Sequence, residues 1–224
     1  TCRVDGSQPV KFARGFWPRW SPDGRQIAFI GIHVSGGEQI GPRIFCVDAE
    51  GGTPRRLTAG DSNESNPSWS RDGKWVYFFS ARSEAYGIWK VPAGGGQPSL
   101  VLPNVLQVLE SVDGNLLFYW KAGQIWKVPV ASGEPVPVLK TSSRIWTLSA
   151  TGIYVLDPDA EGGPAIQFFH FAGNRRPDIR RLEGIPEDYY FTFERIDVSA
   201  DARWIVYSCR DRYESDIMLA ENFR

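Results

Sequence analysis

The chain has 224 residues, a formal net charge of -1 and a pI near 6.1, and this near-neutral balance argues against an electrostatic nucleic-acid binder. No segment contains the roughly 20 consecutive apolar residues of a membrane-spanning helix. Aromatic residues make up 13% of the chain, and 23 Gly and 16 Pro accompany them, a composition typical of packed sheets joined by frequent turns.

A five-residue motif recurs along the chain. It reads WSPDG at residues 20–24, WSRDG at 69–73 and ESVDG at 110–114, and it is degenerate at 148–152 (LSATG) and 198–202 (VSADA). Each copy precedes an apolar run, and the copies follow one another at intervals of roughly 40–50 residues. Such a period, with several short strands per repeat, predicts a β-propeller.

Each repeat reads as four strands. The first strand ends at the motif, whose Asp-Gly pair suits a tight hairpin turn, and a β-branched and aromatic second strand follows. After a variable loop come a third strand, as at residues 43–47, 87–91 and 124–128, and a short fourth strand, as at 55–58 and 136–139. The sequence therefore predicts an all-β fold, a β-propeller of four-stranded antiparallel blades with about five repeats.

We expect one propeller domain over residues 1–224. Its repeats are a partial one at roughly 1–12 and then 13–60, 61–103, 104–140, 141–183 and 184–224. The fourth strands form outer edges, which basic side chains protect against pairing with another sheet; these side chains are Arg55, Arg56, Arg180 and Arg181.

The two ends of the chain leave two interpretations open. Residues 1–9 fit a third strand and its turn, and residues 215–220 fit a third strand that no fourth strand follows. Either residues 10–12 complete the last blade and close a ring, or the chain is a fragment of a larger propeller. The additional third strand at the start favours the fragment, which would need further blades or a partner copy to cover its open faces.

Three segments carry a family resemblance. Residues 18–29 (PRWSPDGRQIAF), 66–78 (NPSWSRDGKWVYF) and 52–58 (GTPRRLT) resemble the TolB-type, WD-like propeller repeat. The resemblance extends over nearly the whole chain, although the last two repeats have lost most of the motif. It implies the propeller fold. Similar propellers occur in periplasmic TolB, a partner of a peptidoglycan-associated lipoprotein, in prolyl-oligopeptidase-like and tricorn-type peptidases, and after a winged helix and a membrane span in bacterial regulators.

Motifs of catalysis are sparse. The chain has two His and lacks a Gly-x-Ser-x-Gly elbow, a His-x-x-x-His zinc motif and a P-loop. We expect His33 in a loop and His170 in an apolar strand. Residues 157–162 (DPDAEG) space three carboxylates like the start of a calcium loop, but Phe168 stands where a bidentate Glu belongs, so a polar hairpin is the better interpretation.

The three cysteines, Cys2, Cys46 and Cys209, lack metal-ligand spacing. We interpret Cys46 and Cys209 as small strand residues, and a Cys2–Cys209 disulfide remains an open alternative. No metal and no cofactor are expected.

Charged residues on the first strands are the candidates for binding, because these strands line the channel of a propeller. The candidate residues for a ligand or partner are Arg19, Glu64, Glu110, Arg144, Glu194 and Arg195, with Tyr189 and Tyr190 from an acidic and aromatic loop. The alternative is that these acids and bases pair with one another. Variable loops expected at residues 31–42, 81–86 and 157–164 are further candidates.

The function that we expect is a non-enzymatic TolB-like scaffold, bacterial and periplasmic, that binds a protein or peptide or senses a ligand. The alternative is a hydrolase, a lyase or a peptidase-associated propeller that uses channel carboxylates, and a cytoplasmic location is also open. An incomplete propeller would self-associate. We expect this domain to contact neither nucleic acid nor membrane.

Overall fold

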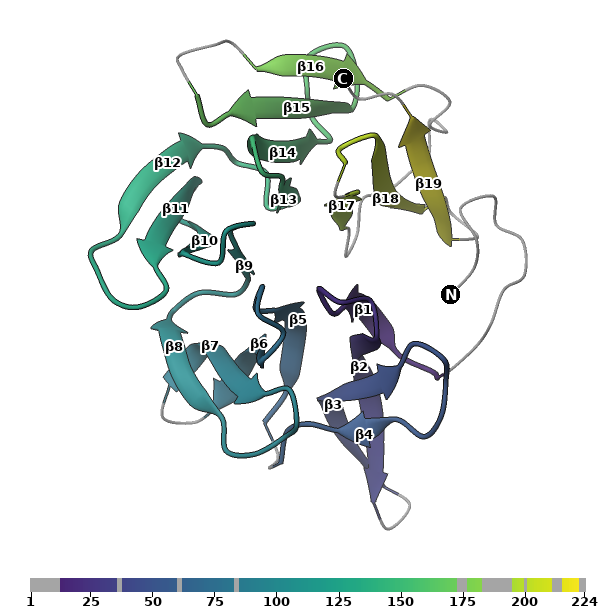
Figure 1. Ribbon diagram of the computed structural model, residues 1–224. Helices are drawn as coiled ribbons and strands as arrows, with labels where there is room; N and C mark the ends of the chain where they lie inside the picture. Colours follow the sequence, from purple (N-terminus) through teal and green to yellow (C-terminus); the bar gives the residue numbers. More distant parts are fainter. Residues whose placement is uncertain are drawn as a thin grey trace. The chain divides into compact units, whose positions relative to one another are not determined.

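The computed structural model describes residues 13–35, 38–59, 62–82, 85–172, 177–182, 195–199, 201–210 and 215–221. All elements in these ranges are strands, and none of the described residues forms a helix of the length and apolarity that crossing a membrane requires. The fold is an all-β propeller of four-stranded antiparallel blades, as the sequence predicts (Figure 1).

Five sheets follow one another along the chain, each with its strands in sequence order. Sheet 1 contains β1 (Phe16–Trp20), β2 (Gln26–Ser35), β3 (Glu38–Asp48) and β4 (Arg55–Arg56). Sheet 2 contains β5 (Glu64–Trp69), β6 (Trp75–Arg82), β7 (Ala85–Pro92) and β8 (Ser99–Pro103). Sheet 3 contains β9 (Val108–Glu110), β10 (Leu116–Lys121), β11 (Gln124–Pro129) and β12 (Val136–Lys140).

Sheet 4 contains β13 (Trp146–Leu148), β14 (Gly152–Asp157), β15 (Ala165–His170) and β16 (Asp178–Arg181). Sheet 5 shows three strands among the described residues: β17 (Ile196–Val198), β18 (Trp204–Arg210) and β19 (Ser215–Glu221). The chain divides into two compact units. Unit 1 holds sheets 1 and 2 and most of sheet 3, and unit 2 holds sheets 4 and 5.

The recurring motif forms the turn between the first and second strands. In sheet 1 the Ser21 hydroxyl donates to Asp23 Oδ1 at 2.6 Å and accepts from the Gln26 N–H at 2.9 Å, while Gly24 adopts a left-handed φ of 69°. Sheet 2 repeats this geometry at Ser70 and Asp72. The Ser21 hydroxyl, and then the Arg25 N–H, lower the pKa of Asp23, so the turn is stabilised with its carboxylate charged.

The last copy of the motif, at residues 198–202, keeps this turn although alanine replaces the glycine. Ser199 donates to Asp201 Oδ1 at 2.6 Å and accepts from the Trp204 N–H at 3.0 Å. Ala202 stands at the glycine position with a φ of 55°, a conformation that costs an L-residue roughly 1–2 kcal/mol.

We therefore expect Ala202→Gly to raise the free energy of unfolding by about 0.5–1 kcal/mol, since glycine's greater freedom in the unfolded chain offsets part of the relieved strain. The reciprocal change Gly73→Ala should lower stability by a similar amount; open space surrounds the Cβ position there, so the effect isolates the backbone strain. Urea unfolding of both variants measures the two shifts, and shifts of the same sign would contradict this account.

Neighbouring sheets within each unit pack through buried aliphatic and aromatic side chains. Between sheets 1 and 2 the core contains Ala28, Ile30, Ile44, Cys46, Leu57, Trp69, Val76, Phe78 and Val91. Between sheets 2 and 3 it contains Tyr77, Ile88, Val105, Val108, Leu117, Tyr119 and Val128. Between sheets 4 and 5 it contains Tyr154, Leu156, Ile166, Ile196, Ile205 and Tyr207. Both faces of sheet 2 are thus apolar, which accounts for strands in it that read as nearly continuous hydrophobic runs.

Side-chain hydrogen bonds also link the first strands of unit 1. Trp69 Nε1 donates to the Arg19 carbonyl at 2.9 Å, and Ser68 Oγ donates to the Val108 carbonyl at 2.9 Å. These bonds connect β1 to β5 and β5 to β9, and they fix the first strands of three consecutive sheets relative to one another.

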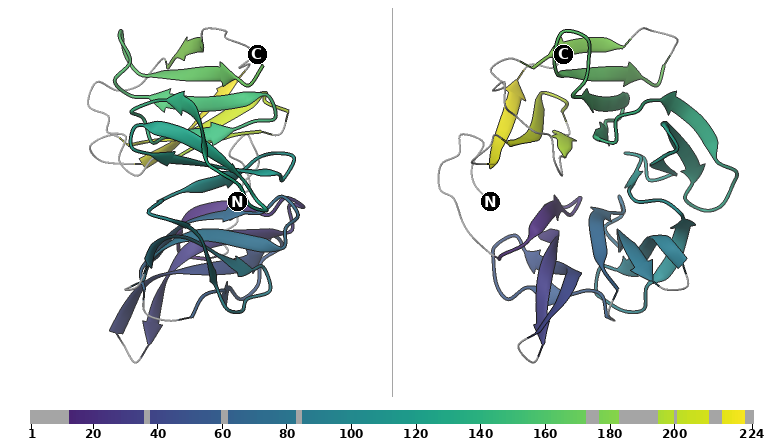
Figure 2. Two further views of the ribbon diagram at one scale, coloured as in Figure 1. Left: turned by 90° about the vertical axis from the view of Figure 1, so that its left-hand side faces the viewer. Right: turned by 180° about the vertical axis from the view of Figure 1, so that it is seen from behind.

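We name the two ends of the sheets in unit 1 by their connections. The hairpin end carries the recurring motif turns. The loop end carries the connection from the second to the third strand and from the fourth strand to the next sheet. The β2–β3 hairpin is the longest at the loop end and extends beyond its neighbours (Figure 2).

Two loop predictions were wrong at this end. The loop expected at residues 31–42 is mostly strand, because β2 continues to Ser35 and β3 begins at Glu38; His33 therefore lies in β2. The loop expected at 81–86 is also short, since β6 ends at Arg82 and β7 begins at Ala85. Alternating apolar residues in β2 continue the pairing with β3 beyond the point where Gly31 and Pro42 suggested a break.

Candidate functional site

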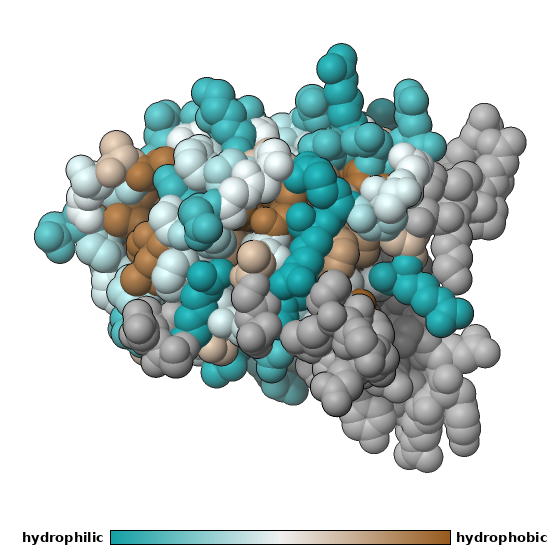
Figure 3. Space-filling model, turned by 90° about the horizontal axis from the view of Figure 1, so that it is seen from below, coloured by the Kyte–Doolittle hydropathy of each residue, from teal (hydrophilic) through white to brown (hydrophobic). Residues whose placement is uncertain are grey.

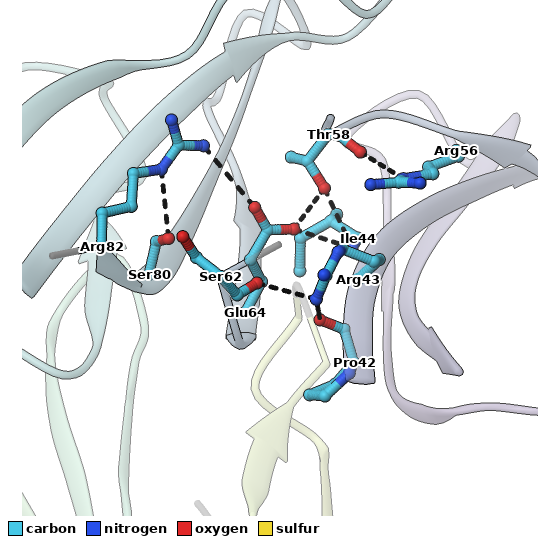
Figure 4. A network of polar contacts seen from close by, with 9 residues as sticks. All are labelled: Pro42, Arg43, Ile44, Arg56, Thr58, Ser62, Glu64, Ser80 and Arg82. Carbon is cyan, nitrogen blue, oxygen red and sulfur yellow. Dashed lines mark hydrogen bonds and ion pairs between the residues drawn. The ribbon is translucent and has the colours of Figure 1, made fainter. Parts of the chain in front are cut away.

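A buried carboxylate organises the loop end between sheets 1 and 2. Glu64, the first residue of β5, is 1% exposed. Its Oε2 atom accepts a hydrogen bond from the Thr58 hydroxyl and another, at 3.3 Å, from the Ile44 N–H (Figure 4). Ile44 lies in β3 of sheet 1, and Thr58 lies in the segment that follows β4. The Glu64 side chain therefore links the start of one blade to the preceding one.

Two arginines surround this carboxylate. Arg43 is fully buried, and its Nη1 donates to the carbonyls of Pro42 and Ser62, each at 2.8 Å. Arg82, at the end of β6, has Nη2 3.6 Å from Glu64 Oε1 and Nε 3.3 Å from the Ser80 hydroxyl (Figure 4). The Arg43 contacts attach the middle of β3 to the connection between the sheets, which is how a fully buried guanidinium is accommodated.

Burial is the largest influence on Glu64 and raises the pKa of its carboxyl group. The hydrogen bonds from Thr58 and Ile44 lower that pKa, and the charges of Arg43 and Arg82 lower it further without reversing the direction. Burial thus opposes the negative charge of Glu64, while the guanidinium groups of Arg43 and Arg82 favour it. We call Glu64, Thr58, Arg43 and Arg82 the Glu64 cluster.

The backbone of the loop end is unusual at several positions. Trp17 and Asn66 occupy the same place in β1 and β5, both with left-handed φ (53° and 54°) and both at a β-bulge. Asn104 and Ala122 are also left-handed, with φ of 60° and 50°. Asn66 Nδ2 donates to the Leu106 carbonyl at 2.7 Å, which couples the bulge to the connection before β9. Bulges and left-handed residues other than glycine concentrate at functional sites.

Large apolar side chains are exposed beside these bulges. Phe16, Ile32, Tyr86 and Leu106 are between 45% and 58% exposed, and all four lie at the loop end of unit 1. Tyr86 also contacts Phe79 edge-on, with ring centres 6.3 Å apart. Seen from below, the surface shows apolar side chains in small patches among hydrophilic ones (Figure 3). Aromatic side chains, here Phe16 and Tyr86, are enriched at protein–protein interfaces.

The second acidic candidate of unit 1, Glu110, lies elsewhere. Glu110 ends β9 at the hairpin end, where its Oε1 accepts from the Arg71 N–H at 3.3 Å. It holds the place in sheet 3 that Trp69 holds in sheet 2, about 15 Å along the strand from the level of Glu64. The structure therefore does not bring Glu64 and Glu110 together, and a hydrolytic pair of carboxylates would need a separation of roughly 5–10 Å.

Burial raises the pKa of Glu110, although the Arg71 N–H and the Tyr77 hydroxyl lower it in part. Because the pKa is higher in the folded state, the folded protein binds the proton more tightly, and stability falls as pH rises from the unfolded value through the folded one. We expect Glu110→Gln to be more stable than the parent chain at pH 7 by about 1 kcal/mol and to lose this advantage towards pH 4.

Chemical denaturation at a series of pH values measures the Glu110→Gln effect. Glu134→Gln, in the exposed turn before β12, is the control and should leave the pH dependence of stability unchanged. A Glu110→Gln advantage that grew at acidic pH would contradict the direction of the shift.

The other predicted site residues fall in several places. In unit 1, Arg19 is partly buried in β1 and its carbonyl accepts from Trp69. In unit 2, Arg144 is exposed before β13, and Arg195 is partly buried before β17. Glu194, Tyr189 and Tyr190 lie outside the described residues, as does Cys2 of the expected disulfide alternative, and the structure describes no side chain for Cys209.

The calcium-like segment forms the β14–β15 hairpin. Asp157 Oδ1 accepts from the Asp159 N–H at 3.1 Å, and Oδ2 accepts from Gln167 Nε2 at 3.0 Å, so both oxygens serve the hairpin. His170 contacts Asp178 at 2.7 Å on the neighbouring edge strand. Within the part of the chain that the structure describes, no three His, Cys, Asp or Glu side chains are grouped to hold a metal ion.

Sequence reasoning selected Glu64 but missed its partners Thr58, Arg43 and Arg82. One of these partners lay in a sequence motif: Thr58 is the last residue of the repeat segment at 52–58 (GTPRRLT). Its hydroxyl donates to Glu64. Arg82 lies in β6 of the same sheet as Glu64, two residues beyond Ser80, the register partner of Glu64, so strand pairing could have found it. Arg43 carried no signal, because it lies in sheet 1 and only the packing of sheet 1 against sheet 2 brings it to the carboxylate.

Residues 10–134, more than half of the chain, match the family profile of the TolB beta propeller domain. The chain belongs to the TolB β-propeller family. The solved TolB of Acinetobacter baumannii is similar over 98% of this chain and 56% of its own, with a TM-score of 0.75 and 19% identity, a likeness that concerns the fold.

Sequence relatives match this TolB-type chain over shorter segments. The uncharacterised protein Atu1656 of Agrobacterium fabrum is 36% identical over 80 residues, 36% of this chain and 26% of that protein. The uncharacterised peptidase YuxL of Bacillus subtilis is 44% identical over 59 residues, 26% of this chain and 8% of the peptidase. The chain therefore matches about a quarter or less of the length of these relatives and about half of the solved TolB.

Proposed function

We propose that this TolB-type propeller is a non-enzymatic binding module, and that the loop end of unit 1 binds a protein or peptide partner. The observation that carries the proposal is the difference between the two ends of the sheets. The hairpin end repeats one turn, with a Ser-Asp hydrogen bond and a left-handed glycine. The loop end collects bulges, left-handed residues and the long β2–β3 hairpin. In repeat proteins, variation concentrated on one side is typical of the binding side.

The exposed side chains at the loop end support the proposal. Ile32 and Tyr86 are about half exposed and project from β2 and β7, which pair with the cluster strands β3 and β6. The hairpin end also exposes apolar side chains, such as Val112 and Val136, but its turns are alike from blade to blade. Side chains held on paired strands lose little conformational entropy when a partner binds, and the loop end presents different side chains from one sheet to the next.

The peptidase YuxL supports a second candidate, a propeller that accompanies a hydrolase. The match covers 8% of that peptidase and therefore concerns propeller repeats. In unit 1, the two acidic candidates lie at opposite ends of the sheets, and each is engaged in hydrogen bonds that join neighbouring blades. These contacts favour a structural role for both carboxylates over a catalytic one.

The proposal extends to the location of the protein and to its lack of nucleic-acid binding. The family likeness to TolB supports a location outside the cytoplasm, which the sequence resemblance also implies. Nearly balanced charge supports the absence of duplex nucleic-acid binding by this domain at physiological salt.

A peptide-display experiment tests the proposed function. The whole chain, immobilised, is panned against a library of random 12-residue peptides, and the selected peptides are synthesised and titrated. We expect selection of a related set of peptides whose affinity falls at least about tenfold in an Ile32→Ser, Tyr86→Ser double variant. The matched control, Val112→Ser with Val136→Ser at the hairpin end, removes equally exposed side chains and should leave the affinity unchanged.

Failure to select any peptide would refute the binding proposal, and loss of affinity in the control pair would place the site at the other end. A panel of chromogenic peptide and glycoside substrates tests the enzymatic alternative. Turnover by the parent chain that disappears in Glu110→Gln would establish catalysis and overturn the scaffold interpretation.

A further inference from the structure

Arg82 differs from the other members of the Glu64 cluster because it reaches the surface. Its side chain is 27% exposed, whereas Glu64 is 1% exposed and Arg43 is fully buried. Arg82 ends β6 on the face that packs toward sheet 1, two residues after Ser80 and four after the core residue Phe78. It therefore lies at the loop end of sheet 2, on the face that packs against sheet 1.

The guanidinium of Arg82 is held in place from several sides. Its central carbon lies 4.5 Å from the centre of the Trp89 ring, a cation–π contact, and Nε lies within hydrogen-bonding distance of Ser80. Nη2 lies 3.6 Å from Glu64 Oε1. A guanidinium that is already ordered loses little conformational entropy when it binds, and its planar fork matches the geometry of a carboxylate.

Arg82 carries the positive charge of the cluster that reaches the surface. Arg43 is fully buried, and both arginines lie near Glu64, whose pKa burial raises. The Arg82 side chain is 27% exposed, so a partner group can approach its guanidinium. Charge complementarity favours an anionic partner group there.

An exposed apolar side chain, Ile32, lies on sheet 1, which faces the Arg82 side of sheet 2. Ala28 and Ile30 of β2 pack against sheet 2, and Ile32 continues the alternation on the same side of the strand, where it is 46% exposed. The facing surfaces of sheets 1 and 2 therefore offer an ordered cation and an exposed aliphatic side chain at the same end.

We propose that Arg82 binds an Asp or Glu side chain of the partner peptide, with an apolar residue of the same peptide against Ile32. This inference rests on the proposed binding function of the loop end and specifies the chemistry of its partner. The Arg82–carboxylate pair adds a charge-assisted hydrogen bond to a cation that the cluster already orients.

The peptides selected by display on the whole chain test this inference. We expect them to be enriched in Asp or Glu next to an apolar residue, and we expect Arg82→Gln to weaken a selected peptide about tenfold or more. Replacing the acidic residue of that peptide with its amide should cost the same factor in the parent chain and little in Arg82→Gln. Arg25→Gln, an exposed arginine at the hairpin end, is the control and should bind like the parent chain.

Two measurements separate binding from folding. Thermal unfolding shows whether Arg82→Gln keeps the fold, and Arg82→Lys keeps the charge while it removes the planar fork, so we expect an intermediate affinity. Peptides without enrichment in acidic residues, or equal affinity for Arg82→Gln and the parent chain, would overturn this inference and leave the binding function standing. Selection of no peptide at all would overturn both.

Discussion

Glu64→Leu is expected to lower the free energy of unfolding by about 3–5 kcal/mol, the cost typical of removing one partner from a buried ion pair. The leucine fills a similar volume, but it leaves the buried Arg43 without its nearby carboxylate and removes the acceptor of the Thr58 hydroxyl. Glu64→Gln keeps an oxygen acceptor and relieves the burial of a charge, but unlike Glu110→Gln it also loses the ion pair with Arg82 and the attraction to Arg43, so its expected cost is about 1 kcal/mol.

Equilibrium unfolding in urea at pH 7 measures both Glu64 variants. Glu50→Leu, in the exposed turn between β3 and β4, is the control and should change stability by less than about 0.5 kcal/mol. If Glu64→Leu were as stable as the parent chain, the cluster would not hold sheets 1 and 2 together, and the ordered state of Arg82 would need another explanation.

The second large effect concerns two tryptophans at the same position of the repeat. Trp69 is buried against sheet 1, where it packs in the shared core and donates Nε1 to the Arg19 carbonyl. Trp20, the equivalent residue of sheet 1, is 51% exposed. We expect Trp69→Ala to cost about 3–5 kcal/mol of unfolding free energy and Trp20→Ala about 1 kcal/mol or less.

Trp69→Phe separates the two contributions of the buried ring. It keeps most of the apolar contact and removes the bond to the Arg19 carbonyl, so about 1 kcal/mol of the loss should remain. Thermal or urea unfolding of the three variants gives the comparison. Equal losses at Trp69 and Trp20 would show that the motif position, and not its burial between blades, determines the contribution.

The repeat motif was sufficient to predict the blades because its chemistry is local. Ser21, Asp23 and Gly24 lie within four residues of one another, and the turn that they form is closed by their own side chains and backbone. The same turn persists at Ala202 despite the loss of glycine, since Ser199 and Asp201 still make its hydrogen bonds. This is why even the degenerate copies predicted strands at the right places.

The candidate site was predicted only in part, for a physical reason. Glu64 and Glu110 looked alike as charged residues of first strands, but they occupy opposite ends of those strands and different interfaces between blades. The alternation of a strand shows which face a residue is on, and it does not show which residues of another sheet will meet it. Arg43 became relevant to Glu64 only through that packing, whereas Arg82 meets Glu64 within sheet 2, across the pairing of β5 with β6.

From the sequence by itself, the turn chemistry, the four-strand repeat and the family of this chain were determined, because hairpins depend on neighbouring residues and on a regular period of apolar runs. The tertiary structure alone decided which carboxylate meets which arginine, that β2 and β3 extend past the expected loop, and that Arg82 reaches the surface while Arg43 does not. The meeting of Glu64 with Arg43 depends on how sheet 1 packs on sheet 2, and the length of the β2–β3 hairpin depends on strand pairing within sheet 1. The local residue pattern determines neither the packing nor the full extent of that pairing.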